Sequence, residues 1–358
     1  MNATLAFLMA TAIKIAVTLA ALLTGVAYSV WMERKVLAHI QNRWGPQRVG
    51  PFGLLQSVAD GIKGILKEDL LPPYVNRPLY ILAPILSLAT ALTAIAIIPI
   101  GPVANVLGFI TPIQITGVLD ANGKGTDIGV GLLLILGITS LGVYGIALAG
   151  WSSHSKYSLL GALRACAQMV SYEIALGLSL VGVLILAGTF SLREIVDQQQ
   201  GLWWHCIPRW NIFRGQFIAF FVYLMAAFAE TNRAPFDLPE AETELVAGYH
   251  TEYSAMKFAM FFMSEYANMI TVACLASVLF LGGWSGPVPT FLPVVLQAIM
   301  PTLWFFLRLV FFMFLFIWVR STLPRFRYDQ LMAFSWKFLF PLSLANIVGT
   351  ALWVAWIG

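Results

Sequence analysis

The sequence predicts an all-α membrane protein, a polytopic helical bundle with about eight transmembrane helices. Hydrophobic residues make up 59% of the 358-residue chain and charged residues only 11%, whereas a soluble domain carries roughly 25% charged residues. Long apolar segments recur along the chain, and short basic loops separate them. Because so little polar surface is available, we expect a bilayer to solvate most of the exterior.

The expected spans follow from the length of each apolar segment, since a spanning helix needs roughly 20 mostly apolar residues. They cover residues 5–31, 79–100, 128–149, 160–187, 217–229, 258–281, 303–319 and 338–357. The fifth segment is short and ends just before Glu230. We find no separate soluble domain, and we expect residues 1–358 to form a single membrane domain.

The basic residues predict the orientation of the bundle. Lys and Arg are concentrated in the loops after the first, third, fifth and seventh spans, and the other loops contain only Lys124, Arg193, Arg209 and Arg214. The positive-inside rule therefore makes the first set cytoplasmic, including the acidic loop at 230–255, and puts both termini outside. This pattern also explains the net charge of +4, so we do not expect binding to nucleic acid.

Residues 53–71 have a different pattern from the spans. Their apolar residues recur at helical spacing and form one stripe, while Gln56, Asp60, Lys63 and Lys67 fall on the opposite face. Such a segment is too polar to cross a bilayer. We expect an amphipathic helix at the cytoplasmic interface.

Metal and redox sites are not indicated by the sequence. Cys166, Cys206 and Cys274 are far apart, and the four histidines do not have metal-ligand spacing. We therefore expect neither a metal nor a redox cofactor to be bound by this chain.

Two acidic residues fall inside the predicted spans, Glu173 in the fourth and Glu265 in the sixth. A carboxyl group at membrane depth is costly, so it commonly marks an ion or proton pathway. The alternative is a carboxyl that only hydrogen-bonds between helices or lies near a helix end. We favour a pathway, because leucine would be less costly at a position that serves packing alone.

The densest polar segment is ETNRAPFDLPEAETE, at 230–244. Asp237 could cap a helix with Glu240 in its first turn, since acids there complement the helix dipole. That explanation leaves Glu242 and Glu244 unexplained. Clustered carboxylates raise one another's pKa and share protons, so the segment could collect protons at the mouth of a membrane helix. A solvated acidic loop is the alternative, and the sequence leaves both interpretations open.

A third polar site follows the first span, with Glu33, Arg34 and Lys35 and then Arg43. Charges at such a place normally anchor a helix at the membrane interface, and this is our interpretation of Lys35. These residues alone do not identify a substrate.

Taken together, these motifs identify a family. The chain resembles, over nearly its whole length, the quinone-site membrane subunit (the bacterial H subunit) of proton-pumping NADH:quinone oxidoreductase, respiratory complex I. The matching stretches are ERK at 33–35, RWGPQRVGPFG at 43–53, LQSVADGIK at 55–63, GW at 150–151, KYSLLG at 156–161, RACAQMVSYE at 164–173, ETNRAPFDLPE at 230–240, EYS at 252–254 and PRFRYDQLM at 324–332. Related membrane-bound hydrogenases use a similar subunit without quinone, but the full motif set is more like the quinone enzyme.

The resemblance implies a membrane subunit that forms the quinone channel and couples quinone reduction to proton translocation. Peripheral-arm quinone-site subunits and other membrane-arm subunits would be its partners, in a bacterial inner membrane. NADH, FMN and the iron–sulfur clusters would be bound by those partners, and quinone would be the substrate. Whether it is ubiquinone or menaquinone does not follow from the sequence.

The resemblance also assigns roles to matching residues. The residues placed at the quinone entrance and its adjoining loop are Glu33, Arg34, Arg43, Asp60, Lys63, Arg233 and Asp237. The residues placed in a proton or charge relay are Glu173, Glu230, Glu240, Glu242, Glu244 and Glu265, with Tyr172 and Tyr266 nearby.

Two other classes of protein are possible for such a composition. A self-sufficient secondary transporter, such as a cation/proton antiporter, would show an inverted repeat with broken helices, and we find none. A purely structural anchor would not need acids at Glu173 or Glu265. Ion transport by the isolated chain, or its co-purification with redox subunits, would distinguish these classes.

Overall fold

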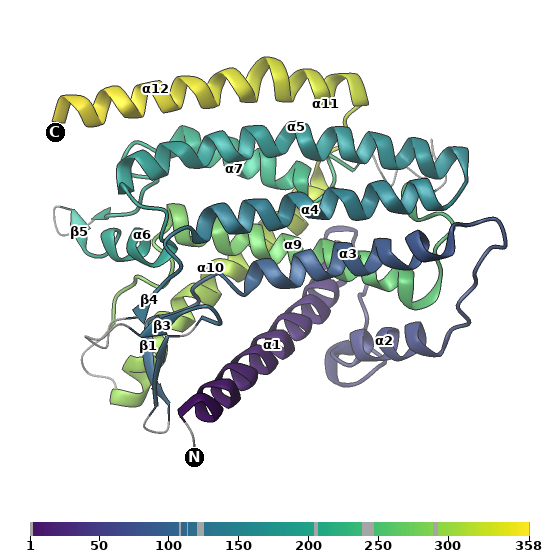
Figure 1. Cartoon of the computed structure of the whole chain (residues 1–358), viewed down its shortest axis with the longest axis horizontal. Helices are drawn as coiled ribbons and strands as arrows, with labels where there is room; N and C mark the ends of the chain where they lie inside the picture. The colour runs from purple at the N-terminus through teal and green to yellow at the C-terminus, as the bar shows by residue number, and fades with distance from the viewer. Residues whose placement is uncertain are drawn as a thin grey trace.

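The computed structural model describes residues 3–106, 109–112, 114–119, 125–203, 207–237, 247–288 and 293–357. Figure 1 shows long helices lying side by side, with α12 along one edge and α1 crossing the bundle at an angle. Both chain ends and the small hairpins lie toward one end of the bundle, and α2 lies at the other. The core is formed where α5 packs against α4, α7 and α12, and where α3 packs against α4 and α9.

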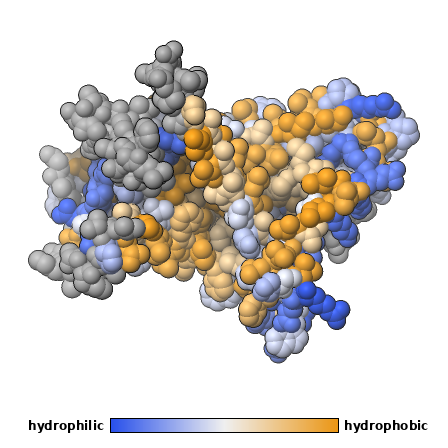
Figure 2. Space-filling model, turned by 90° about the horizontal axis from the view of Figure 1, so that it is seen from below, coloured by the Kyte–Doolittle hydropathy of each residue, from blue (hydrophilic) through white to orange (hydrophobic). Residues whose placement is uncertain are grey.

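The helices confirm a polytopic helical bundle. Seven segments of the described chain are long and apolar enough to cross a membrane. Their helices are α1 (Ala3–Ile40), α3 (Arg77–Ile95), α4 (Gly131–Ser152), α5 (Lys156–Ala187), α9 (Ala255–Phe280), α10 (Val294–Thr322), and a last segment of α11 (Tyr328–Phe334), the π-helical turn η3 (Ser335–Leu339) and α12 (Phe340–Ile357). Figure 2 shows the broad apolar band that they present between hydrophilic surfaces.

The expected fifth span is a shorter helix, α7 (Phe217–Glu230). Its 14 residues extend for about 21 Å, less than the roughly 30 Å of a bilayer core. One face of α7 is fully buried, including Tyr223, Phe228 and several alanines. Neighbouring helices therefore surround much of α7, which ends at the polar loop of residues 231–237.

The first helix is longer than the sequence suggested. We expected it to end at 31, but α1 continues to Ile40. The intervening residues contain neither glycine nor proline and include good helix formers. As a result Glu33 and Arg34 stand on a rigid helix, not on a loop.

The expected amphipathic helix over 53–71 is α2, which covers only Gln56–Leu66. The short helix η1 (Pro51–Gly53) precedes it. At Lys67 the backbone becomes extended, and the chain leaves the helix there. The apolar stripe faces away from the bundle, with Ile62 53% and Leu66 80% exposed, while the Ser57 hydroxyl donates to the carbonyl of Ala27 on α1 at 2.6 Å.

The loops at 101–127 and 190–216 contain regular structure that the sequence did not predict. Three antiparallel hairpins are present, β1 (Val103–Val106) with β2 (Phe109–Pro112), β3 (Val118–Leu119) with β4 (Gly125–Thr126), and β5 (Leu202–Trp203) with β6 (Ile207–Pro208). The second loop also contains α6 (Leu192–Gln198), whose N-cap Ser191 accepts a hydrogen bond from the N–H of Glu194. These strands are too short for a recognisable alternation of apolar and polar residues.

Small residues let the helices approach closely. A Cβ on Gly145 of α4 would collide with the Ser87 hydroxyl of α3, and one on Gly150 would collide with the Ala162 Cβ of α5. Close approach of this kind is typical of helix packing in membranes, where van der Waals contact replaces the hydrophobic effect. It brings α3, α4 and α5 together around the acidic residues described below.

Candidate functional site

Glu33 lies at the meeting point of four segments of the chain. Its side chain on α1 is 7% exposed, and it accepts a hydrogen bond from the Tyr266 hydroxyl of α9 at 2.7 Å. Arg233, in the loop after α7, places Nη1 at 3.3 Å from Glu33 Oε2. Arg320, near the end of α10, forms an ion pair with Glu33 Oε1. One carboxylate is therefore held between two guanidinium groups, which makes this cluster net positive.

Arg233 is itself buried, with a side-chain exposure of 6%. Its guanidinium lies 4.2 Å from the ring centroid of Tyr266, an arrangement that favours the charged form. Burial alone lowers the pKa of Arg233, but the neighbouring Tyr266 and Glu33 outweigh burial and the pKa lies above its usual value. Nε and Nη2 have no hydrogen-bond partner within the described residues.

Arg34 and Asp60 connect α1 to α2. Their ion pair measures 2.6 Å, with side-chain exposures of 49% and 38%, and Gln56 donates to the other oxygen of Asp60 at 3.0 Å. Asp60 and Gln56 thus face α1, while the apolar stripe of α2 faces outward. A shallow open groove of about 610 Å³ runs along α2 and includes Ile62 and Lys63.

Two predicted entrance residues stand apart from these pairs. Arg43 donates to the side chain of Gln41 at 2.7 Å, and Lys63 lies on the exposed side of α2. Neither forms an ion pair in the part of the chain that the structure describes. The structure therefore gives no contact that joins them to Glu33.

A second group of acids surrounds a small internal cavity of about 20 Å³. Glu230 and Glu265 both line it, together with Asn268, Ser87 and Tyr249. Glu265 accepts a hydrogen bond from the Tyr249 hydroxyl at 3.0 Å. Oε2 of Glu230, Oδ1 of Asn268 and the Ser87 hydroxyl are buried without a partner among the described residues. Unpaired polar groups of this kind are costly inside a protein.

Glu173 stands on α5 and accepts a hydrogen bond from the Ser140 hydroxyl of α4. Its neighbour Tyr172 points to a different helix, since the Tyr172 hydroxyl donates to the carbonyl of Leu331 at 2.9 Å. The two residues are therefore adjacent in sequence but do not share an environment.

The loop after α7 is held by α5 and by the segment before α11. Gln168 of α5, which is fully buried, donates to the carbonyls of Ala229 at 2.8 Å and Phe236 at 2.7 Å. Asp237 pairs with Arg325 at 2.9 Å. Glu240, Glu242 and Glu244 lie outside the described residues.

The comparisons with known proteins agree with the motifs. The family model described as NADH dehydrogenase matches residues 13–351. An NADH-quinone oxidoreductase H subunit of Koribacter versatilis is 70% identical over 350 residues, which cover 98% of both chains. An H subunit of Solibacter usitatus is 48% identical and covers 98% of both chains, and one of Geobacter sulfurreducens is 47% identical over 96% of this chain and 94% of its own. The chain belongs to the H-subunit family of NADH-quinone oxidoreductase, complex I.

Membership of the H-subunit family makes this chain one part of a multisubunit membrane enzyme, and its apolar helices agree with a bacterial membrane protein. It works together with other complex I subunits. Within the described residues no group of three or more His, Cys, Asp or Glu side chains could hold a metal ion.

Sequence reasoning missed several residues of the site in this H subunit. Arg320 directly follows the expected seventh span, where the sequence marks it only as one of the basic loop residues, although it pairs with Glu33. Ser140, Tyr249 and Gln168 contact the predicted acids or their loop. Serine, tyrosine and glutamine are common at helix contacts in membranes, so their residue types alone did not single them out.

Proposed function

We propose that this H subunit forms the quinone channel with peripheral subunits and couples quinone reduction to proton translocation. The single observation that carries the proposal is Glu33, buried between Arg233 and Arg320 and hydrogen-bonded to Tyr266. A buried ion pair commonly costs more in desolvation than it returns. A cluster that gathers charges from four segments is therefore better explained by function than by stability.

The channel side of the site is formed by α1 and α2. Arg34 and Asp60 hold the polar face of α2 against α1, and the outward apolar stripe offers a surface that a quinone tail can follow from the bilayer. Arg34 directly follows Glu33 in sequence, so the exposed pair at α2 and the buried cluster share one turn of α1. A headgroup that arrives near this turn lies close to the positively charged cluster.

The relay side begins at α9. Tyr266 contacts Glu33, and the preceding residue Glu265 lines the cavity with Glu230. A cavity of about 20 Å³ is large enough for one water molecule. A water there would join Glu230 and Glu265 and would satisfy the Glu230 oxygen that lacks a protein partner. Glu173, paired with Ser140, extends the series toward α4.

Quinone reduction is coupled to proton movement through a change of charge near the headgroup. Reduction of a quinone to a quinol takes up two electrons and two protons, and electrons that arrive before the protons make the headgroup transiently negative. Arg233 is suited to respond to this charge, because it interacts electrostatically with both Glu33 and Glu265. A shift of Arg233 toward either acid changes how tightly the acids around the cavity hold a proton.

The remaining parts of the enzyme are assigned to partner subunits. Peripheral-arm subunits hold NADH, FMN and the iron–sulfur cluster that reduces the quinone. The other membrane-arm subunits are the partners to which this chain passes the effect of quinone reduction for proton translocation. The chain lies in the bacterial inner membrane with both termini on the periplasmic side, in agreement with the positive charges of the loops at the α2 end.

Glu33→Gln in the assembled enzyme tests this function. It keeps the size of the side chain but leaves Arg233 and Arg320 without a counter-charge. NADH:quinone activity should fall by about tenfold or more, while NADH oxidation by a water-soluble acceptor, which takes electrons upstream, should remain. Glu194→Gln, at an exposed position of the mostly buried α6, is the matched control. Unchanged quinone activity in Glu33→Gln, with assembly confirmed on a native gel, would remove the cluster from the mechanism.

A further inference from the structure

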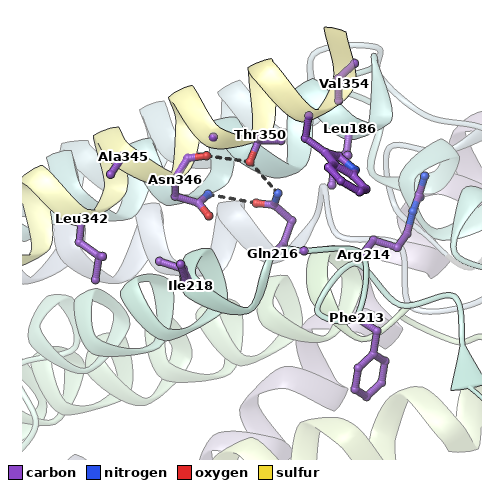
Figure 3. Close-up of a pocket in the computed structure, with 13 residues that line it drawn as sticks. Leu186, Phe213, Arg214, Gln216, Ile218, Leu342, Ala345, Asn346, Thr350 and Val354 are labelled. Carbon is purple, nitrogen blue, oxygen red and sulfur yellow. Dashed lines mark hydrogen bonds between the residues drawn. The ribbon is translucent and has the colours of Figure 1, made fainter. Parts of the chain in front are cut away.

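An open groove runs between α5, α7 and α12, and it includes the start of α7, whereas Glu230 stands at the opposite end of that helix (Figure 3). Its volume is about 810 Å³. Leu186 of α5, Ile218 of α7, and Leu342 and Val354 of α12 form apolar walls. Figure 3 shows Ile218 and Leu342 near one end of this groove, and Val354 and Arg214 near the other.

The polar side chains inside the groove are bonded to one another. Gln216 donates to the Thr350 hydroxyl at 2.9 Å and accepts from the Asn346 amide at 3.2 Å. All three residues are less than 9% exposed. This network fixes the beginning of α7 against α12, so the groove has a rigid floor whose polar groups need no ligand.

The helices that form the groove end at different levels. Gln216 immediately precedes α7 and contacts Thr350, but α12 continues to Ile357. The last seven residues of α12 extend for roughly 10 Å beyond the start of α7, and residues 351–356 are all exposed. Trp353 and Trp356 lie on this stretch, and tryptophan is enriched where a bilayer meets water.

Arg214 supplies a positive charge at this end of the groove. It is partly buried, and among the described residues its guanidinium makes a long hydrogen bond of 3.5 Å to Asn211. In the described parts of the chain it has no ion pair with a carboxylate. Burial and the nearby Arg209 both lower its pKa. Arg214 therefore brings a positive charge, with Arg209 near it and no carboxylate partner among the described residues, to this end of the apolar groove.

We propose that this groove binds one anionic phospholipid of the phosphatidylglycerol class, from the leaflet on the side of the C-terminus. Its phosphate pairs with Arg214, because a guanidinium binds phosphate oxygens in a bidentate manner. Its acyl chains lie along Ile218, Leu342 and α12. Because α7 begins short of the end of α12, the headgroup reaches Arg214 below the level of the tryptophans. An anionic lipid suits this site better than a zwitterionic one, since the local charge is positive and uncompensated.

Photo-crosslinking in native membranes identifies the occupant directly. A photoreactive amino acid replaces Ile218, which is 45% exposed and lines the groove, and mass spectrometry of this chain then reports what is attached. We expect a phosphatidylglycerol adduct, enriched over its share of the membrane lipids. As a control, the same photoreactive amino acid replaces Leu352, which is 67% exposed and does not line the groove. At that position it should label lipids in proportion to the membrane composition.

Two pairs of variants link the adduct to the groove. Arg214→Gln should reduce the phosphatidylglycerol adduct by about tenfold, while Arg77→Gln, an equal charge change at the start of α3, should not. Gly349→Leu should also abolish it, because a Cβ there meets nothing within 4 Å and the side chain would fill the groove. Gly177→Leu, an equally open position on α5 outside this groove, is the control.

Three results would overturn the proposal. One is an adduct between Ile218 and a polypeptide, which would show that a neighbouring subunit covers the groove. Another is a lipid adduct that Arg214→Gln leaves unchanged, or whose headgroups match the bulk membrane. The third is the absence of any adduct at position 218 when Leu352 in the same preparation labels lipid.

Discussion

Glu265 and Tyr266 are consecutive residues of α9 whose side chains belong to different polar clusters. Glu265 accepts from Tyr249 and lines the cavity with Glu230, whereas Tyr266 donates to Glu33 and lies against Arg233. Adjacent residues on an α-helix point about 100° apart, so one helical step connects the two clusters. Arg233 also interacts electrostatically with Glu265, so the clusters can influence each other through charge.

Removal of the tyrosine hydroxyls should test this connection. Tyr266→Phe and Tyr249→Phe each delete one hydrogen bond to a buried acid, which is worth roughly 1–2 kcal/mol. We expect quinone-linked turnover to fall by about 5- to 30-fold in each variant. If both acids belong to one relay, the double variant should lose less than the product of the single losses. Fully multiplicative losses, measured as NADH:quinone rates, would show that the clusters act independently.

Arg320 should act as a positioning residue for Glu33. Arg320→Met removes one of the two cations around the carboxylate, so Glu33 keeps Arg233 as its guanidinium partner. We expect a marked loss of quinone activity, with partial recovery in Arg320→Lys because the charge returns without the guanidinium geometry. Arg327→Met, at a side chain that is 80% exposed, is the control. Equal NADH:quinone rates in Arg320→Lys and Arg320→Met would indicate that the charge of this residue is not needed.

The pair between Arg34 and Asp60 should matter for quinone access more than for stability, because exposed pairs contribute only about 0–1 kcal/mol. Arg34→Ala and Asp60→Ala should each raise the KM for quinone and spare NADH oxidation by a water-soluble acceptor. The exchange Arg34→Asp with Asp60→Arg should restore part of the activity if the link between α1 and α2 is what counts. Equal loss of both activities would instead indicate defective assembly.

Glu173 should belong to the proton path and not to helix packing alone. Glu173→Gln keeps the hydrogen bond to Ser140 but cannot exchange a proton, so turnover and proton pumping should fall together by about tenfold or more. Glu173→Asp should keep partial activity, since the acid remains. Ser140→Ala should have the milder effect, because it removes a hydrogen bond and leaves the acid. Wild-type pumping by Glu173→Gln in membranes would make this residue a structural hydrogen-bonder.

The orientation of the bundle is open to a direct test by reporter fusions. Fusions after Arg48, Lys156, Tyr249 and Arg327 should report the cytoplasm, because the basic loops resist translocation. Fusions near Asn122, near Gln199 and at the C-terminus should report the outside. Reversed signals at two of these positions would exclude the proposed topology.

The order of the apolar helices followed from the sequence alone. An apolar segment of sufficient length forms a helix in a bilayer wherever it lies, because its backbone must satisfy its own hydrogen bonds. That requirement is local, so each expected span coincides with a helix, but only seven of the eight are long enough among the described residues to cross a membrane, and α7 is not. The ends of α1 and α2 agreed less well, because a helix can continue through polar residues or stop before an apolar stripe ends.

Glu173 and Glu265 could be placed inside helices from the sequence, because a carboxyl group within an apolar segment is conspicuous in any context, whereas Glu33 and Glu230 were singled out by the family motifs. The partners of these acids did not follow from the sequence. Helical periodicity shows which residues share a face, but it does not show which of several neighbouring helices that face meets. Only the packing of α1, α9 and α10 brought Arg320 and Tyr266 to Glu33, and only the contact of α4 with α5 brought Ser140 to Glu173. Pairings between residues so distant in sequence depend on the whole bundle, so the tertiary structure alone determined them.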